Sequence, residues 1–186
     1  MFTKEYWVSS FKKFKSVRYL SIMGFLIALR FVLEHFRIPV SENLNIMFTY
    51  VPAALEAMII GPGAGIITAA VSDLLSGFLA GYGPFFPGYM VSKIVSALIY
   101  GLFFYRTKVS LKKIAFAKAI NNYLVNVCLG SLWNSILYGK AFVVYASASL
   151  VKNTILLPVE VTVLYLLFKA LIPYLSRRGI IKDTTI

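Results

Sequence analysis

Long apolar stretches separated by short polar segments dominate the pattern along the chain. A helix needs roughly 20 mostly apolar residues to cross a bilayer. Six stretches reach or approach that length, at about 18–36, 46–61, 63–80, 87–105, 114–136 and 148–172. The pattern therefore predicts an all-α membrane protein with six transmembrane helices. They form a single transmembrane domain over residues 1–186, which begins with a basic segment at about 1–17.

Glycine and proline mark the expected turns between these helices. Gly61, Pro62 and Gly63 separate the second and third stretches, which predicts a tight turn between two antiparallel helices. Residues 81–88 are rich in glycine, proline and aromatic side chains, and we expect a structured loop there. Further loops are expected at about 37–45 and 138–147.

Composition and charge agree with a membrane protein. Of the 186 residues, 59% are hydrophobic and only 14% are charged, whereas a soluble domain carries about 25% charged residues. The net charge is +12, which by itself would also suit a nucleic-acid-binding protein. The distribution of the basic residues argues against nucleic acid, because they follow the topology of the predicted helices.

Most of the 19 basic residues fall on one side of the membrane when six helices alternate in direction. That side holds Lys4, Lys12, Lys13, Lys15, Arg18, Arg106, Lys108, Lys112, Lys113, Lys118, Lys169, Arg177, Arg178 and Lys182. The opposite loops hold only Arg37 and Lys140. The positive-inside rule therefore predicts cytoplasmic N- and C-termini, with the basic residues meeting anionic lipid of the bilayer. No small-residue cleavage site follows the first stretch, so we expect it to remain as a span.

Four charged residues lie in the outer halves of predicted spans, where each costs at least ~2.5–3.5 kcal/mol. They are Arg30, Asp73, Lys93 and Lys152. Three cations against one carboxylate predict a site for an anionic ligand, and Arg30 suits bidentate binding of a carboxylate. One alternative is that Asp73 neutralises Lys93 or Arg30. Another is that Lys93 and Lys152 extend to the outer interface.

Polar and aromatic side chains at a similar depth extend this candidate site. Asn126, Trp133 and Asn153 lie in the fifth and sixth stretches. The third loop and the start of the fourth helix add the aromatic residues Tyr82, Phe86 and Tyr89. These aromatic residues suit a lid over a ligand, and the alternative is an interfacial aromatic belt.

Three further charged residues, Glu56, Lys118 and Glu160, lie toward the inner side. We interpret them as structural ion pairs, with a proton-coupled path as the alternative.

The sequence lacks the residues that several classes of function require. The sequence has no P-loop motif for ATP, and its single histidine, His35, leaves no metal cluster and no catalytic triad with a matching motif. An enzyme is therefore disfavoured, and no cofactor or metal is expected. Six short helices also leave little room for the repeats of a self-sufficient secondary transporter. A binding subunit that depends on a separate energy source fits better.

The order of short motifs resembles one known family. The motifs are Leu26-Ile27-Ala28-Leu29-Arg30, Gly61-Pro62, Ser72-Asp73-Leu74-Leu75, Phe86-Pro87-Gly88, Ile99-Tyr100-Gly101-Leu102, Leu132-Trp133 and Val151-Lys152-Asn153. Over about residues 20–170 the chain resembles the substrate-binding S components of energy-coupling factor (ECF) vitamin transporters. It looks most like the folate-specific group, although Ser149 stands where an arginine is usual in that group.

The resemblance implies a subunit that captures a vitamin from outside and delivers it with a transmembrane coupling protein and two ATPases. Gly24 and Ala28 match the small-residue motif that faces the coupling protein in this family. Alternatives are an S component for another vitamin and a membrane scaffold of rod-shape-determining type.

The chemical groups of folate match the types of the candidate residues. Its two carboxylates would suit Arg30, Lys93 or Lys152, and its flat rings would suit the aromatic side chains. Its pterin edge would suit Asp73, Asn126 or Asn153.

Overall fold

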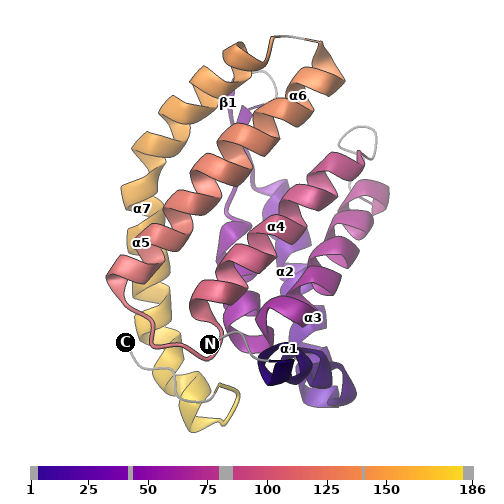
Figure 1. Ribbon diagram of the computed structural model, residues 1–186, viewed down its shortest axis with the longest axis vertical. Helices are drawn as coiled ribbons and strands as arrows, with labels where there is room; N and C mark the ends of the chain where they lie inside the picture. The colour runs from indigo at the N-terminus through magenta and orange to yellow at the C-terminus, as the bar shows by residue number, and fades with distance from the viewer. Residues whose placement is uncertain (1–3, 42–43, 80–85, 140, 182–186) are drawn as a thin grey trace. The chain divides into compact units, whose positions relative to one another are not determined.

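The computed structural model describes residues 4–41, 44–79, 86–139 and 141–181, and most of this backbone is helical (Figure 1). The chain divides into two compact units, Met1–Tyr105 and Arg106–Ile186. They are called the N-terminal unit and the C-terminal unit below.

The N-terminal unit contains α1 (Lys4–Phe11), the 3-10 helix η1 (Lys12–Lys15), α2 (Val17–His35), strands β1 (Ile38–Ser41) and β2 (Leu44–Ile46), α3 (Tyr50–Leu79) and α4 (Pro87–Phe104). The C-terminal unit contains α5 (Leu111–Ile120), the π-helix η2 (Asn121–Leu129), α6 (Gly130–Tyr138) and α7 (Phe142–Arg177).

These bounds agree with the six predicted stretches to within a few residues at most ends. Helix α3 combines the second and third stretches across a break, and α5, η2 and α6 follow one another without interruption as the fifth. Within the described parts of the chain, α3, α4 and α7 are each long and apolar enough to cross a membrane. Counted together, α1, η1 and α2 would be a fourth such span, bent by 89°.

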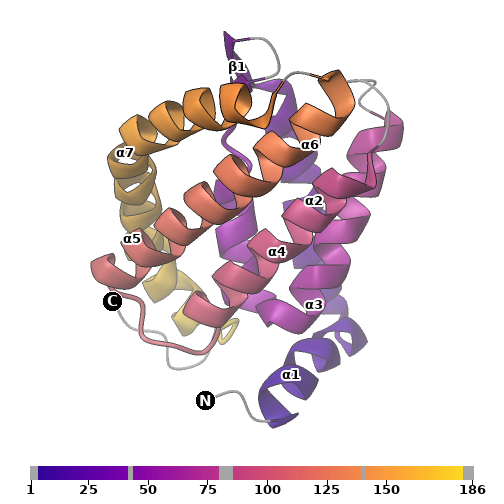
Figure 2. The ribbon, with the colours of Figure 1, turned by 45° about the horizontal axis from the view of Figure 1, so that its top comes forward.

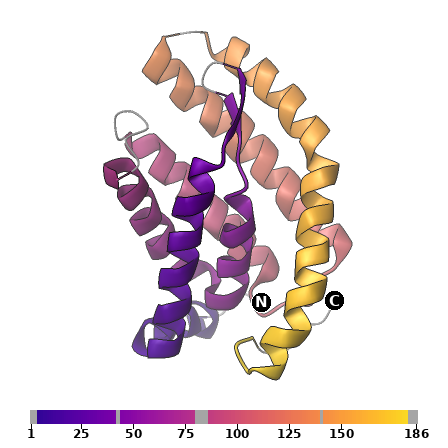
Figure 3. The same ribbon diagram turned by 180° about the vertical axis from the view of Figure 1, so that it is seen from behind.

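The break in α3 lies at Gly61, whose φ of 83° is open to glycine but strained for other residues. A Cβ atom at this position would also lie 2.8 Å from the Tyr105 ring. Pro62 then begins the second half of α3, where its missing N–H costs nothing. Figures 1 and 3 show the two halves running in opposite directions, which confirms the predicted turn.

Small residues let α3 and α4 approach closely near this break. A Cβ atom at Gly101 would lie only 2.7 Å from the Pro62 Cα atom, so a larger residue would force the backbones apart. A Cβ atom at Gly65 would meet the Ala97 Cβ atom at 3.7 Å, an ordinary contact. These small residues therefore serve packing within the N-terminal unit.

The basic N-terminal segment is folded, which the sequence pattern did not predict. Helix α1 packs against α3 at its break (Figure 2). Ser10 Oγ donates a hydrogen bond to the Ile60 carbonyl at 2.6 Å and accepts one from the Ala64 N–H at 2.8 Å. Tyr6 Oη donates to the Gly101 carbonyl at 2.9 Å. Ser10 thus bonds to backbone groups on both sides of the α3 break, where helical partners are missing, and Tyr6 ties the segment to α4.

A short hairpin stands where the sequence predicted the first loop. Strands β1 and β2 pair antiparallel, with Ile38 opposite Ile46, and Figure 3 shows them leading from α2 toward α3. The hairpin is the one sheet among the described residues. It leaves the all-α class unchanged.

In the C-terminal unit, the stretch from α5 to α6 packs along α7. Ile114 and Ala117 of α5 and Leu164 and Phe168 of α7 are fully buried. Helix α7 bends along its length (Figure 2), and Pro158 stands inside it. A proline removes one helical hydrogen bond and crowds the preceding turn, which is a usual cause of such a bend.

Candidate functional site

The N-terminal unit contains a buried group of charged residues, the N-terminal charge cluster. It consists of Arg30 and Glu34 from α2, Glu56 and Asp73 from α3, and Lys93 from α4. Arg30 is ion-paired with Glu56, and the two residues are 5% and 0% exposed. Because a lone buried charge is very costly, each of these two groups requires the other.

Lys93 connects three helices within this cluster. Its Nζ atom lies 2.6 Å from Glu34 Oε1 and 3.1 Å from Asp73 Oδ1. The Lys93 side chain is 28% exposed and the two carboxylates about a tenth. The alternative in which Asp73 neutralises Lys93 is therefore the one that the structure shows.

The expected excess of cations is wrong for this cluster. Arg30 and Lys93 supply two positive charges, while Glu34, Glu56 and Asp73 supply three negative charges, so the formal net charge is −1. From the sequence, Glu56 was expected toward the inner side and Glu34 was not considered. The long arginine and lysine side chains can reach carboxylates at a different depth along a neighbouring helix.

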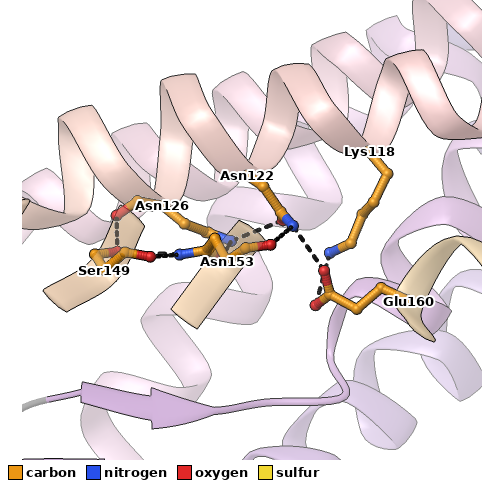
Figure 4. A network of polar contacts seen from close by, with 6 residues as sticks. All are labelled: Lys118, Asn122, Asn126, Ser149, Asn153 and Glu160. Carbon is orange, nitrogen blue, oxygen red and sulfur yellow. Dashed lines mark hydrogen bonds and ion pairs between the residues drawn. The ribbon is translucent and has the colours of Figure 1, made fainter. Parts of the chain in front are cut away.

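The C-terminal unit contains a second polar group, the asparagine network. Figure 4 shows its six residues, Lys118, Asn122, Asn126, Ser149, Asn153 and Glu160. At one end, Lys118 Nζ lies 3.1 Å from Glu160 Oε1. Asn122 Nδ2 donates to the other carboxylate oxygen, Oε2, at 2.7 Å. Lys118 is 2% exposed, so this ion pair lies inside the unit and not in a cytoplasmic loop.

At the other end of the network, amide groups bond to one another. Asn126 Nδ2 donates to Asn122 Oδ1 at 3.2 Å and to Asn153 Oδ1 at 3.1 Å. Asn153 Nδ2 donates to the Ser149 carbonyl at 2.8 Å and to its Oγ at 3.0 Å. Ser149 Oγ in turn donates to the Asn126 carbonyl at 3.2 Å. Both donor hydrogens of Asn126 and Asn153 are thus used.

The π-helix η2 carries two residues of the network, Asn122 and Asn126. A π-helix forms i→i+5 hydrogen bonds and is rare, and single-turn π-bulges are often found at functional sites. Asn122 and Asn126 lie four residues apart within it.

The sequence predictions anticipated the network in part. Asn126 and Asn153 were candidates, and the structure brings them together. The interpretation of Glu56, Lys118 and Glu160 as members of ion pairs agrees with the structure, in which Lys118 pairs with Glu160 and Glu56 pairs with Arg30. Asn122 and Ser149 were missed. The four-residue spacing of Lys118, Asn122 and Asn126, which places them along one helix face, is the signal that would have found Asn122.

The remaining candidates lie at several places in the two units. Phe86 and Tyr89 meet edge to face at the start of α4, with ring centroids 5.9 Å apart. Trp133 of α6 and Lys152 of α7 are half-buried. Tyr82 lies outside the described residues.

The charged residues Lys118, Lys152 and Glu160 together carry a formal net charge of +1, whereas the N-terminal charge cluster carries −1. Lys118 is paired with Glu160.

Several apolar helices that enclose buried ion pairs and amide networks define an integral membrane protein with a polar interior. Residues 14–172 match the family described as ECF-type riboflavin transporter, S component. The chain belongs to this family, so it is a multi-pass protein of the cell membrane and a transporter component.

Individual relatives are folate transporters. The chain is 37% identical over 151 residues to the folate transporter FolT of Clostridium novyi, which covers 81% of this chain and 88% of the relative. It is 30% identical over 157 residues to FolT of Leuconostoc mesenteroides, with 81% and 84% covered. A crystal structure of FolT bound with folic acid matches with a TM-score of 0.74 and 31% identity, over 82% of this chain and 93% of that chain. The resemblance to S components is thus confirmed.

Proposed function

We propose that this protein binds folate at the outer side of the membrane as the S component of an ECF transporter. The likeness along most of their length to relatives described as folate transporters is the observation that carries the proposal. The formal net charge of +1 on Lys118, Lys152 and Glu160 is compatible with the same ligand, because folate brings two carboxylates and riboflavin brings none.

Arg30, Lys93 and Lys152 remain the candidates for the folate carboxylates. Arg30 and Lys93 contact carboxylates of the protein, so a folate carboxylate would compete with those ion pairs. Lys152 is half-buried and directly precedes the candidate Asn153 in α7, and we propose it as the carboxylate contact to test first. Asn126 and Asn153 remain candidates for the pterin edge, and a ligand would have to replace some of their mutual hydrogen bonds.

Calorimetry on the purified protein tests this proposal. Folate is expected to bind at least about 100-fold more tightly than riboflavin or thiamine, because a site built to hydrogen-bond folate would leave buried polar groups unpaired with the other vitamins. Lys152→Gln is expected to weaken folate binding by about tenfold to 100-fold, since it removes a charge-assisted hydrogen bond of about 1.5–3 kcal/mol. Lys169→Gln, an exposed change in the same helix, is the matched control and is expected to leave the affinity within about twofold.

The calorimetric results distinguish folate from riboflavin as the ligand. Tighter binding of riboflavin than of folate would establish the second candidate, which the description of the matching family favours. Unchanged folate binding by Lys152→Gln would refute the role of Lys152 but not the choice of ligand.

We also propose that a transmembrane coupling protein and two ATPases complete the transporter, and that this chain has no catalytic activity of its own. Gly24 and Ala28 are exposed on α2, one helical turn apart. A Cβ atom at Gly24 would meet nothing within 4 Å. This open strip of small residues allows the close approach of a helix from another membrane protein.

Co-purification tests the partner assignment. Gly24→Leu combined with Ala28→Leu is expected to reduce recovery of the coupling protein and ATPases at least about fivefold, because the larger side chains prevent close helix approach. Ala148→Leu with Ala170→Leu, at exposed positions of α7, is the control. Folate binding should survive both pairs of changes. ATP hydrolysis by the isolated chain, or full recovery of the complex with the first pair, would contradict the assignment.

A further inference from the structure

The N-terminal segment Lys4–Lys15, formed by α1 and η1, has no part in the proposed capture of folate. It is nevertheless folded and tied to the rest of its unit. We propose that it is an interfacial helix that binds anionic phospholipid headgroups of the inner leaflet. This inference does not depend on which vitamin the protein binds.

The direction of the segment is the first support. Lys4–Lys15 is bent by 89° from Val17–His35. Because α2 corresponds to the first predicted span, a segment perpendicular to it lies along the membrane plane. A helix in that position is typical of interfacial membrane binding.

The attachment of α1 determines at which end of the N-terminal unit it lies. Ser10 bonds to Ile60 and Ala64 on the two sides of the α3 break, and Tyr6 bonds to Gly101 near the end of α4. Positive-inside topology places both of these regions at the cytoplasmic face. Tyr6 and Ser10 are 7% and 0% exposed, so α1 is held at the depth of the inner headgroups.

The outer surface of the segment combines apolar and basic side chains. Val8 is 42% exposed and Phe11 is 45% exposed. Lys4, Lys12 and Lys15 are also exposed. With Lys13 and against the single acidic residue Glu5, the segment carries a formal net charge of +3.

This combination indicates the partner. Apolar side chains that enter the acyl boundary, beside lysines that meet phosphate, are the features by which such helices bind membranes. The positive charge is complementary to anionic lipid, which the cytoplasmic leaflet supplies. An anionic phospholipid is therefore the occupant that this surface fits.

Trp7 provides a direct probe, because it lies in α1 and Trp133 is the one other tryptophan of the chain. The full chain carrying Trp133→Phe is placed in nanodiscs with equal amounts of phosphatidylglycerol and phosphatidylcholine. Bromine atoms on the acyl chains of one lipid or the other quench tryptophan fluorescence on contact. Quenching of Trp7 is expected to be about twofold stronger when phosphatidylglycerol carries the bromine, and this preference should fall at high salt.

Three sets of variants separate this lipid contact from a general effect of charge. Replacing Lys4, Lys12 and Lys15 with glutamine should abolish the preference, and replacing them with arginine should retain it. The control replaces the exposed Lys108, Lys112 and Lys169 with glutamine and should leave the preference unchanged. The proposal is overturned if Trp7 is not quenched, if both lipids quench it equally, or if the first set keeps the preference. It is also overturned if the control set abolishes the preference.

Discussion

Replacing Lys118 with methionine is expected to lower the free energy of unfolding by about 3–5 kcal/mol, because it leaves the Glu160 carboxylate without its cation. The two side chains form an ion pair at 3.1 Å, and Lys118 is 2% exposed. Thermal unfolding in detergent would measure the loss. Lys112→Met, at an exposed position of the same helix, should change stability by no more than about 0.5 kcal/mol.

A second substitution identifies the cause. Adding Glu160→Gln to Lys118→Met removes the uncompensated charge and keeps an acceptor for the Asn122 amide, which bonds to Glu160 Oε2. The double variant should recover at least about half of the lost stability. If Lys118→Met were as stable as Lys112→Met, the ion pair would not stabilise the C-terminal unit.

Arg30→Met is expected to destabilise the protein by a similar amount, about 3–5 kcal/mol, because Glu56 is 0% exposed and would be left charged and unpaired. Adding Glu56→Leu should restore most of this stability, since well-packed apolar residues can replace a buried ion pair. The same thermal unfolding experiment gives both values.

Folate binding by the double variant then decides between two roles for Arg30. If Arg30 serves to neutralise Glu56, the variant with both changes should bind folate within about threefold of the unmodified protein. The sequence alone suggested a direct contact with a folate carboxylate. Arg30 Nε has no hydrogen-bond partner among the described residues, so it retains the capacity for such a contact. Loss of folate binding in a stable double variant would assign that contact to Arg30.

The helical segments were predictable because lipid imposes a strong rule on sequence. Every span must hide its backbone polar groups within a helix and present mainly apolar side chains. The turn at Gly61 and Pro62 was predictable for a local reason, since these residues restrict the backbone themselves. The fold of residues 4–15 was not predictable, because its stability comes from Ser10 and Tyr6 bonding to residues distant in sequence.

The candidate site, like the fold, was predictable only in part. Most of its residue types could be found by their position inside apolar stretches, where a charge or amide is costly and needs a function. Which groups pair could not be found by counting along each helix. The position of a residue along a helix gives its depth in the membrane. It does not tell toward which neighbouring helix the side chain points or how far that side chain reaches.

The sequence by itself therefore determined the membrane class, the approximate bounds of the helical stretches and most of the polar candidates, and the orientation of the helices stays a prediction. Apolar length, basic loops and glycine–proline turns act locally, so each can be recognised from neighbouring residues. Only the tertiary structure decided that Glu34, Glu56 and Asp73 outnumber the cations they contact, and that Lys118 joins Glu160 and Asn122. These pairs form between different helices, and their geometry depends on how those helices pack against one another.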